Sequence, residues 1–173
     1  RRSGACDMWD RSENQITLVL IRHGATKSNI EHRYLGKTDE LLSKEGERQL
    51  VEYKKLHLYP NIDFLFTSPM KRCIQTANIL YPELQPVQMK EWEEMDFGAF
   101  EGKNYVELQG NKLYQAWIDS NGTLPFPEGE SREEFITRCN KGFRGMVEKV
   151  EQIKEEGRKT IGMIVHGGTI MAL

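Results

Sequence analysis

Residues 16–29 read Ile-Thr-Leu-Val-Leu-Ile-Arg-His-Gly-Ala-Thr-Lys-Ser-Asn, and this stretch decides the fold that the sequence predicts. Its first six residues form an unbroken apolar run rich in β-branched side chains, which is typical of a strand buried on both faces. The run ends abruptly at Arg22, His23 and Gly24. In open α/β sheets, ligands bind just beyond the carboxyl ends of such strands. The stretch therefore predicts a strand over 16–21 that leads into a binding site.

The residues that follow the strand suit a phosphate ligand. The planar guanidinium of Arg22 matches a phosphate group, and a neutral imidazole at His23 can act as a nucleophile. Gly24 lets the backbone turn tightly and approach a ligand. A structural salt bridge at the strand end is the simpler explanation of Arg-His-Gly alone, so the longer string has to carry the functional interpretation.

That string resembles the signature of the histidine phosphatase superfamily, which runs Arg-His-Gly-(Glu or Ala)-Thr-x-x-Asn. Further segments resemble later motifs of the same family, in the same order. They are residues 67–77 with Arg72, residues 93–102 with Glu94, residues 125–131, and residues 165–169 with His166. The resemblance covers nearly all of residues 16–173.

The resemblance implies a fold like that of the phosphoglycerate mutases, an α/β three-layer α/β/α sandwich with a mostly parallel sheet. Strands that alternate with helical patterns favour the same fold independently. We expect one domain over 16–173 and a disordered leader or a tail of foreign origin over 1–15, which shows no periodicity. Domains of this family normally continue further beyond the histidine that matches His166, so we expect the C-terminal end of the domain to be missing.

The resemblance also implies a role for each site residue. His23 is the nucleophile that becomes phosphohistidine, with its other ring nitrogen bonded to a backbone carbonyl. His166, a cation or strong donor, holds the phosphoryl oxygens together with Arg22 and Arg72. Glu94 is the general acid and then the general base, so its pKa should lie above the reference of about 4.3. The phosphate-binding residues implied in this way are Arg22, Thr26, Asn29, Arg72, His166 and Gly167.

Each of these residues also has a simpler explanation. A single arginine on a helix, such as Arg72, is usually solvated or ion-paired. The three carboxylates Glu93, Glu94 and Asp96 within four residues usually mark a solvated loop, and a small shift of the alignment would select a neighbour of Glu94. A lone histidine at a strand end, such as His166, is usually structural. The functional interpretation depends on all the motifs occurring together.

Composition limits the partners that we expect. Lys plus Arg total 24 against 26 Asp plus Glu, so no general basic field indicates nucleic acid, and no apolar run is long enough for a membrane span. The three cysteines are widely separated, which favours reduced thiols and a cytoplasmic location, with Cys73 and Cys139 as buried filler. The four histidines lack the spacing of a metal site, so we expect no metal and no cofactor.

Local patterns predict the remaining elements. Ser43 should cap a helix with Leu50, Tyr53 and Leu56 on its buried side, and Ser68-Pro69 should begin another that buries Cys73. Strands are predicted over 63–67, 87–92 and 161–165, and a helix near Leu108, Leu113 and Trp117. Ser131 and Glu134 form a capping box before the clearest helix of the chain. Its apolar residues are Phe135, Cys139, Phe143, Met146, Val150 and Ile153.

Three functions fit this sequence. The first is a phosphomonoesterase acting on a small phosphorylated metabolite, with α-ribazole 5′-phosphate as one candidate. The second is a phosphoglycerate mutase, although the mutases are usually longer and the Gly24-Ala25 pair leans toward a phosphatase. The third is a phosphate pocket that binds a partner without catalysis. In the first two, the partner is a small-molecule phosphate ester; the sequence indicates no oligomeric state.

Overall fold

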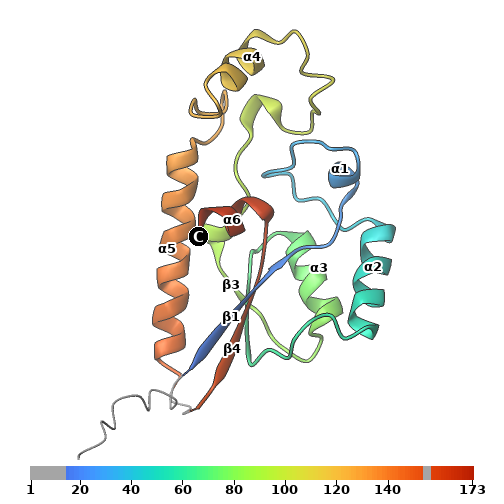
Figure 1. Ribbon diagram of the computed structural model, residues 1–173, viewed down its shortest axis with the longest axis vertical. Coiled ribbons are helices and arrows are strands. Elements are labelled where there is room, and N and C mark those ends of the chain that lie inside the picture. Colours follow the sequence, from blue (N-terminus) through green and yellow to red (C-terminus); the bar gives the residue numbers. More distant parts are fainter. Residues whose placement is uncertain (1–14, 154–156) are drawn as a thin grey trace, which may run out of the picture.

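The computed structural model describes residues 15–153 and 157–173, so the predicted segment 1–15 lies outside it except for Gln15. The strands form one sheet in the order β1-β4-β2-β3, and every neighbouring pair is parallel. Their bounds are β1 Ile16–Arg22, β2 Phe64–Thr67, β3 Val87–Gln88 and β4 Lys159–Val165. The α/β class with a parallel sheet is thereby confirmed (Figure 1).

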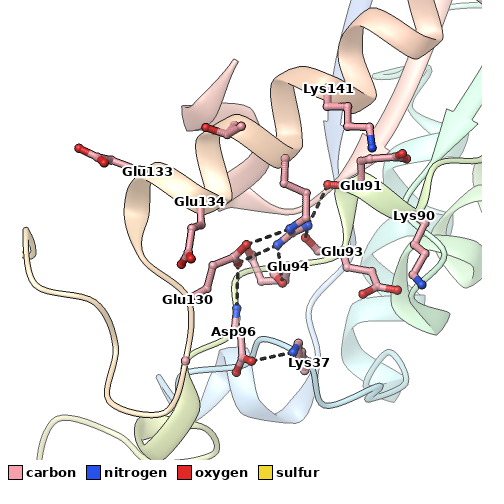
Figure 2. A pocket seen from close by; sticks show the side chains of 13 residues that line it. Lys37, Lys90, Glu91, Glu93, Glu94, Asp96, Glu130, Glu133, Glu134 and Lys141 are labelled. Atoms are coloured by element: carbon pink, nitrogen blue, oxygen red, sulfur yellow. Dashed lines mark hydrogen bonds and ion pairs between the residues drawn. The ribbon is translucent and has the colours of Figure 1, made fainter.

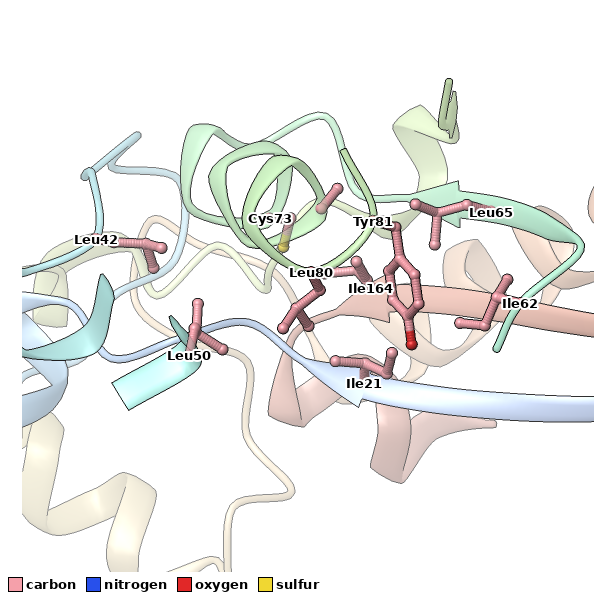
Figure 3. Close-up of a cluster of buried hydrophobic side chains, with 10 residues drawn as sticks. Ile21, Leu42, Leu50, Ile62, Leu65, Cys73, Leu80, Tyr81 and Ile164 are labelled. Carbon is pink, nitrogen blue, oxygen red and sulfur yellow. The ribbon is translucent and has the colours of Figure 1, made fainter. Parts of the chain in front are cut away.

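Helices cover both faces of this sheet. Helices α2 (Lys44–Lys55) and α3 (Lys71–Leu80) lie on one side, and α5 (Arg132–Glu151) and α6 (Gly167–Ala172) lie on the other (Figure 1). Neighbouring residues of β4 pack into two hydrophobic cores, one on each face of the sheet. Ile164 packs with Leu50 and Leu80 toward α2 and α3, as Figure 3 shows, whereas Met163 and Val165 pack with Met146 of α5. This alternation confirms the predicted three layers.

The predicted helix caps of α2 and α5 are confirmed. The Ser43 hydroxyl accepts a hydrogen bond from the Gly46 amide at the start of α2. Ser131 and Glu134 form the reciprocal capping box of α5. Phe135, Cys139, Met146 and Val150 are buried as predicted, while α5 ends at Glu151, before Ile153.

The first strand differs from its prediction. β1 is an edge strand that pairs only with β4 among the described residues, and Ile16, Leu18 and Leu20 are 56%, 38% and 39% exposed. The prediction of burial on both faces is therefore wrong for this strand. An apolar run has the same pattern in a central strand and in an edge strand, so the pattern cannot tell them apart.

Helix α3 starts later than predicted. It begins at Lys71 with Met70 as its N-cap, so Ser68 and Pro69 lie before the helix. The Ser68 hydroxyl does accept a hydrogen bond from the Met70 amide at 3.3 Å, but it also contacts a site residue. The predicted strand 87–92 is likewise shorter, because Lys90–Trp92 forms a 3₁₀ turn, η2.

One predicted buried side and one predicted helix were also too wide. Leu50 of α2 is buried, but Tyr53 and Leu56 are 37% and 61% exposed. The helix of the middle region is α4, Lys112–Asp119, in which Leu113 is exposed, whereas Leu108 lies outside it and is buried. Apolar spacing identified the helices correctly, but their burial depends on what packs over them.

A small aromatic cluster lies beyond the carboxyl ends of the strands. The turn η3 (Gly98–Phe100) and α4 enclose Phe100 and Phe126, with Tyr34 and Trp117 packed against them. The short helix α1, Lys27–Ile30, follows β1 at the same end of the sheet (Figure 1). This end of the molecule therefore carries the loops that surround the strand ends.

Candidate active site

The parallel ladders bring two predicted site residues together. The His23 amide bonds the Val165 carbonyl at 3.1 Å, and the Ser68 amide bonds the Ile164 carbonyl at 3.0 Å, so the pairing continues past the strand ends. His166 follows β4 directly. The ring centroids of His23 and His166 are consequently 5.2 Å apart, at an interplanar angle of 66°.

His23 has the geometry of a nucleophile. Its Nδ1 lies 2.7 Å from the Gly24 carbonyl oxygen, which fixes the proton on Nδ1 and leaves the lone pair on Nε2. This confirms the expected backbone partner. Burial, and then the charges of Arg72 and Arg22, lower the pKa of His23 to about 4, so the ring is neutral at ordinary pH.

Helix α3 holds the turn behind this imidazole. The Gly24 amide donates to the Thr76 hydroxyl at 3.0 Å, and that hydroxyl donates to the Arg72 carbonyl at 2.7 Å. A Cβ at position 24 would come within 2.7 Å of Leu50 Cδ1. A side chain at position 24 would therefore require Leu50 of α2 to shift.

Arg72 is a buried guanidinium whose hydrogen bonds go to backbone carbonyls. Its Nη1 donates to the Thr38 carbonyl at 2.9 Å and its Nη2 to the Gly36 carbonyl at 3.0 Å. Within the described part of the chain, no salt bridge reaches Arg72, and its Nε has no hydrogen-bond partner. A buried charge is costly unless an opposite charge accompanies it, so this group is suited to an anionic ligand.

The loop that holds Arg72 is itself fixed by a glutamate that the sequence reasoning did not single out. Glu101 Oε1 accepts hydrogen bonds from the amides of Gly36 and Thr38 at 2.8 and 3.1 Å. The carbonyls of the same two residues receive Arg72. Glu101 lies within residues 93–102, the third motif. Its place in that motif, directly before Gly102, could have identified it from the sequence.

Glu94 is the carboxyl that the structure distinguishes from its neighbours. Burial raises the pKa of Glu94, in the expected direction, although the Met95 amide donates to its Oε1 at 2.9 Å. Asp96 instead pairs with Lys37 at 2.7 Å, and the Lys37 side chain lowers the pKa of that carboxyl (Figure 2). The pKa of Glu94 is therefore raised where that of Asp96 is lowered, which favours Glu94 as the carboxyl that carries a proton.

His166 was expected to be a cation or a strong hydrogen-bond donor, and the first of these two alternatives does not hold. Burial, and then the charges of Arg72 and His23, lower the pKa of His166 to about 2, so the ring is neutral here rather than a cation. Its Nε2 lies 2.8 Å from the Ser68 hydroxyl and 3.7 Å from Cys73 Sγ. Ser68 and Cys73 were predicted as a cap and as filler, so their contact with the site was missed. A phosphate dianion close to His166 would raise the pKa again.

The remaining predicted phosphate ligands occupy different positions. Asn29 lines a pocket of about 440 Å³ together with Arg22 and His23. Thr26, in contrast, is fully buried, and its hydroxyl accepts from the Asn29 amide in a capping box of α1. Gly167 lies beside the Arg22 guanidinium, because a Cβ there would be 3.6 Å from Arg22 Nε. The structure thus gives Thr26 a capping position and not a place in the pocket.

Two broader features concern metals and membranes. Within residues 15–153 and 157–173, no cluster of three or more His, Cys, Asp and Glu side chains is arranged to hold a metal ion. Among the helices of the same residues, none combines the length and the apolar character needed to cross a membrane.

The site therefore combines a neutral imidazole with a free lone pair, a buried guanidinium held by carbonyls and a carboxyl with a raised pKa. These features suit a site that binds an anionic group beside a nucleophilic side chain. The sequence profile of the histidine phosphatase superfamily (branch 1) matches residues 18–173, and the chain belongs to this family.

Sequence relatives carry both phosphatase and mutase names. The 2,3-bisphosphoglycerate-dependent phosphoglycerate mutase of Cytophaga hutchinsonii is 30% identical over 164 residues, which cover 90% of this chain and 74% of the relative. The uncharacterized phosphatase PhoE of Bacillus subtilis is 34% identical over 158 residues, with the same coverage of 90% and 74%.

Solved structures share the fold. A mutant of phosphoserine phosphatase from Entamoeba histolytica, in complex with phosphoserine, superposes with a TM-score of 0.75 at 26% identity, covering 91% of this chain and 77% of that chain. The protein TTHB049 from Thermus thermophilus superposes with a TM-score of 0.66 at 31% identity, covering 90% and 81%. By family membership, the chain is an enzyme of the phosphatase class.

Proposed function

We propose that this protein is a phosphomonoesterase that hydrolyses a small phosphorylated metabolite through a phosphohistidine at His23. The observation that carries the proposal is the pairing of the neutral His23 ring with the buried Arg72 guanidinium. A neutral Nε2 supplies the nucleophile. Arg22 and Arg72 supply positive charge for the phosphoryl oxygens, a task that Mg²⁺ performs in many other phosphoryl-transfer enzymes. The arginines therefore allow the reaction to proceed without a metal.

The first chemical step transfers the phosphoryl group to the enzyme. The Nε2 lone pair of His23 forms a bond to phosphorus as the ester P–O bond breaks. Glu94 gives its proton to the departing oxygen, so the alcohol leaves neutral and the carboxylate remains. His166 and Asn29 donate hydrogen bonds to the phosphoryl oxygens, and the bound phosphate raises the pKa of His166.

The second step returns the enzyme to its starting state. Water attacks the phosphorus of phosphohistidine, and the Glu94 carboxylate takes the proton of that water. The N–P bond breaks, inorganic phosphate forms, and His23 is neutral again. Glu94 thus serves as acid and then as base, for which a raised pKa is suited.

The physiological substrate is a separate part of the proposal. Phosphoglycerate mutase activity is the second candidate, favoured by the similarity to the Cytophaga hutchinsonii mutase. α-Ribazole 5′-phosphate also remains a candidate substrate, but the solved structures named for it are 24% identical to this chain and show only the shared fold. Binding without catalysis ranks last, because the residues required for turnover are all present. We place the enzyme in the cytoplasm, where Cys73 and Cys139 would remain free thiols.

Hydrolysis of p-nitrophenyl phosphate in EDTA tests the proposal. We expect activity in the native protein and a loss of roughly 10⁴-fold or more in His23→Ala, because the covalent path is removed. His57→Asn is the control, since His57 is exposed beyond the end of α2 that lies away from the site. Substantial turnover by His23→Ala would refute the nucleophile.

A substrate panel then separates the candidates. It contains α-ribazole 5′-phosphate, phosphoserine, and 3-phosphoglycerate with 2,3-bisphosphoglycerate. Release of inorganic phosphate from one of the first two would support the phosphatase. Interconversion of phosphoglycerates that depends on the bisphosphate, without release of phosphate, would replace it with the mutase. Binding of phosphate esters without turnover of any of them would favour a non-catalytic domain.

A further inference from the structure

The acid loop, residues 91–96, is held by one side chain of α5. Arg138 Nη1 donates to the carbonyl oxygens of Glu91 and Glu93 at 2.8 and 2.9 Å, and its Nη2 lies 3.5 Å from the carbonyl oxygen of Glu94. Beyond Trp92 this loop belongs to no helix or strand until η3 begins at Gly98. The guanidinium therefore donates hydrogen bonds to backbone carbonyls of the loop, which in a β-strand would be satisfied by a neighbouring strand.

The other side of the guanidinium is also fixed. The Glu130 carboxylate accepts a pair of hydrogen bonds from the Arg138 guanidinium, from Nε to Oε1 at 2.9 Å and from Nη2 to Oε2 at 2.8 Å. Figure 2 shows Glu130 and Asp96 close together, and the Glu130 amide donates to the Asp96 carbonyl at 2.9 Å. Such paired hydrogen bonds fix orientation as well as distance. Arg138 is consequently a clamp between α5 and both ends of the acid loop.

The clamp lies next to the wall that confines the Glu94 carboxyl. Arg138 Cζ is 5.1 Å from the centre of the Phe135 ring. A Cβ placed on Gly168 would be 3.3 Å from that ring and 2.6 Å from Glu94 Oε1. Phe135, Gly168 and the acid loop thus meet around the carboxyl, and α5 contributes both the ring and the guanidinium.

We propose that Arg138 is a positioning residue for the general acid Glu94. It holds the backbone of the acid loop so that the carboxyl remains buried beside Gly168 and meets the leaving oxygen. The proposal rests on the proposed function, in which the Glu94 proton passes to that oxygen as the P–O bond breaks. Arg138 itself would contact neither the substrate nor the phosphoryl group.

This role predicts a dependence on the leaving group. A nitrophenolate is weakly basic and departs with little help from an acid, whereas an alkoxide departs only with a proton. Loss of the clamp should therefore slow the hydrolysis of an alkyl phosphate much more than that of p-nitrophenyl phosphate. General loss of folded protein would lower both rates by the same factor.

The experiment compares kcat/KM for p-nitrophenyl phosphate and ethyl phosphate in each variant. For Arg138→Met we expect a loss of roughly 10²-fold or more on the ethyl ester and of less than about tenfold on the aryl ester. Arg138→Lys keeps the charge but not the paired hydrogen bonds to Glu130. Its preference for the aryl ester over the ethyl ester should therefore lie between those of the native protein and Arg138→Met. Arg144→Met, an exposed position on the same helix, should change neither rate.

Two further variants make each outcome decisive. In Glu94→Gln, kcat/KM should fall more for the ethyl ester than for the aryl ester, by at least as large a ratio as in Arg138→Met. If the two esters are affected equally, Glu94 is not the acid and the proposed function fails at that residue. Glu130→Gln, which weakens one half of the clamp, should show a smaller ratio and tests the proposal even where Arg138→Met does not fold. Equal losses on both esters in the folded Arg138 and Glu130 variants would overturn the role of Arg138.

Discussion

In the candidate site, burial is the largest cause of the pKa shifts of His23, His166 and Glu94. Burial and the charge of Arg72 lower the pKa of His23 and of His166, so both rings are neutral, whereas burial raises the pKa of Glu94 against the opposing charge of Arg72. Opposite shifts in a base and an acid allow both to be in the required form over one range of pH. The environment thus sets the roles that the motifs only suggest.

The pH dependence of kcat/KM should follow from these two shifts. Activity should fall on the acid side as His23 takes a proton with a pKa of about 4, because the cation has no lone pair. It should fall on the alkaline side as Glu94 ionises, above the ordinary range for a glutamate. Steady-state kinetics with an alkyl ester measures both limbs. Glu94→Gln should lose the alkaline limb, and an unchanged limb would contradict the assignment.

The free energy of unfolding should fall as the pH is lowered. The folded-state pKa of His23 is depressed, so its contribution is full above the unfolded value of about 6.5 and is lost as pH falls toward about 4. Denaturant unfolding at pH 7 and pH 5 measures the loss. His23→Asn should lose less stability between these values than the native protein, and an equal loss would place the titration elsewhere.

The position of the general acid Glu94 should depend on the glycine at residue 168. A Cβ there would lie 2.6 Å from Glu94 Oε1, closer than such contacts allow, so Gly168→Ala should displace the carboxyl and lower kcat by roughly 10²-fold. Gly145→Ala is the matched control, because its Cβ would meet only Met89 Cε at 3.5 Å. Full activity in Gly168→Ala would mean that the carboxyl need not stay at this position.

At the scale of the element, the capping box of α5 stabilises the helix that carries Arg138. Removing the Ser131 hydroxyl leaves the Glu134 amide without its acceptor, so Ser131→Ala should cost about 1 kcal/mol and lower Tm by about 2–4 °C. Thermal unfolding measures the shift. Thr137→Ala, an exposed change within the same helix, should move Tm less, and equal shifts would argue against the cap.

How well the sequence predicts an element depends on how local its cause is. The caps at Ser43 and Ser131 were predicted because a hydroxyl and an amide three residues away determine them. Ser68 has the same local pattern, but its hydroxyl bonds His166, a residue 98 positions away that only the parallel sheet brings near. The clamp by Arg138 was missed for the same reason, since its partners lie on a loop 44 to 47 residues earlier.

The candidate site was more predictable than the packing around it. His23, Arg72, Glu94 and His166 each stand inside a motif, and the sheet topology brings the strand-end residues to one edge. What no motif records is the environment: the neutral state of His166, the unpartnered Nε of Arg72 and the capping position of Thr26. These depend on tertiary burial, which a linear pattern does not contain.

On the scale of the whole molecule, the outer side of β1 is an edge at which a further strand can pair with the sheet. No described residue pairs with the outer side of β1, and Ile16, Leu18 and Leu20 present exposed apolar side chains along one face of it. Unpaired strand edges with apolar side chains are templates for pairing with another chain. For a polypeptide limited to these 173 residues, we therefore expect self-association through this edge as its concentration rises.

Light scattering coupled to size-exclusion chromatography tests that expectation. Leu18→Lys places a charge on the exposed apolar face of β1 and should shift the protein toward the monomer, because a buried lysine in a paired edge is costly. Thr17→Lys is the matched control, since its side chain is also exposed but points to the opposite face of the strand. If both variants dissociate equally, charge alone explains the effect. If the native chain remains a monomer at every concentration, the edge is not an association surface, and the exposed leucines are tolerated as isolated apolar groups.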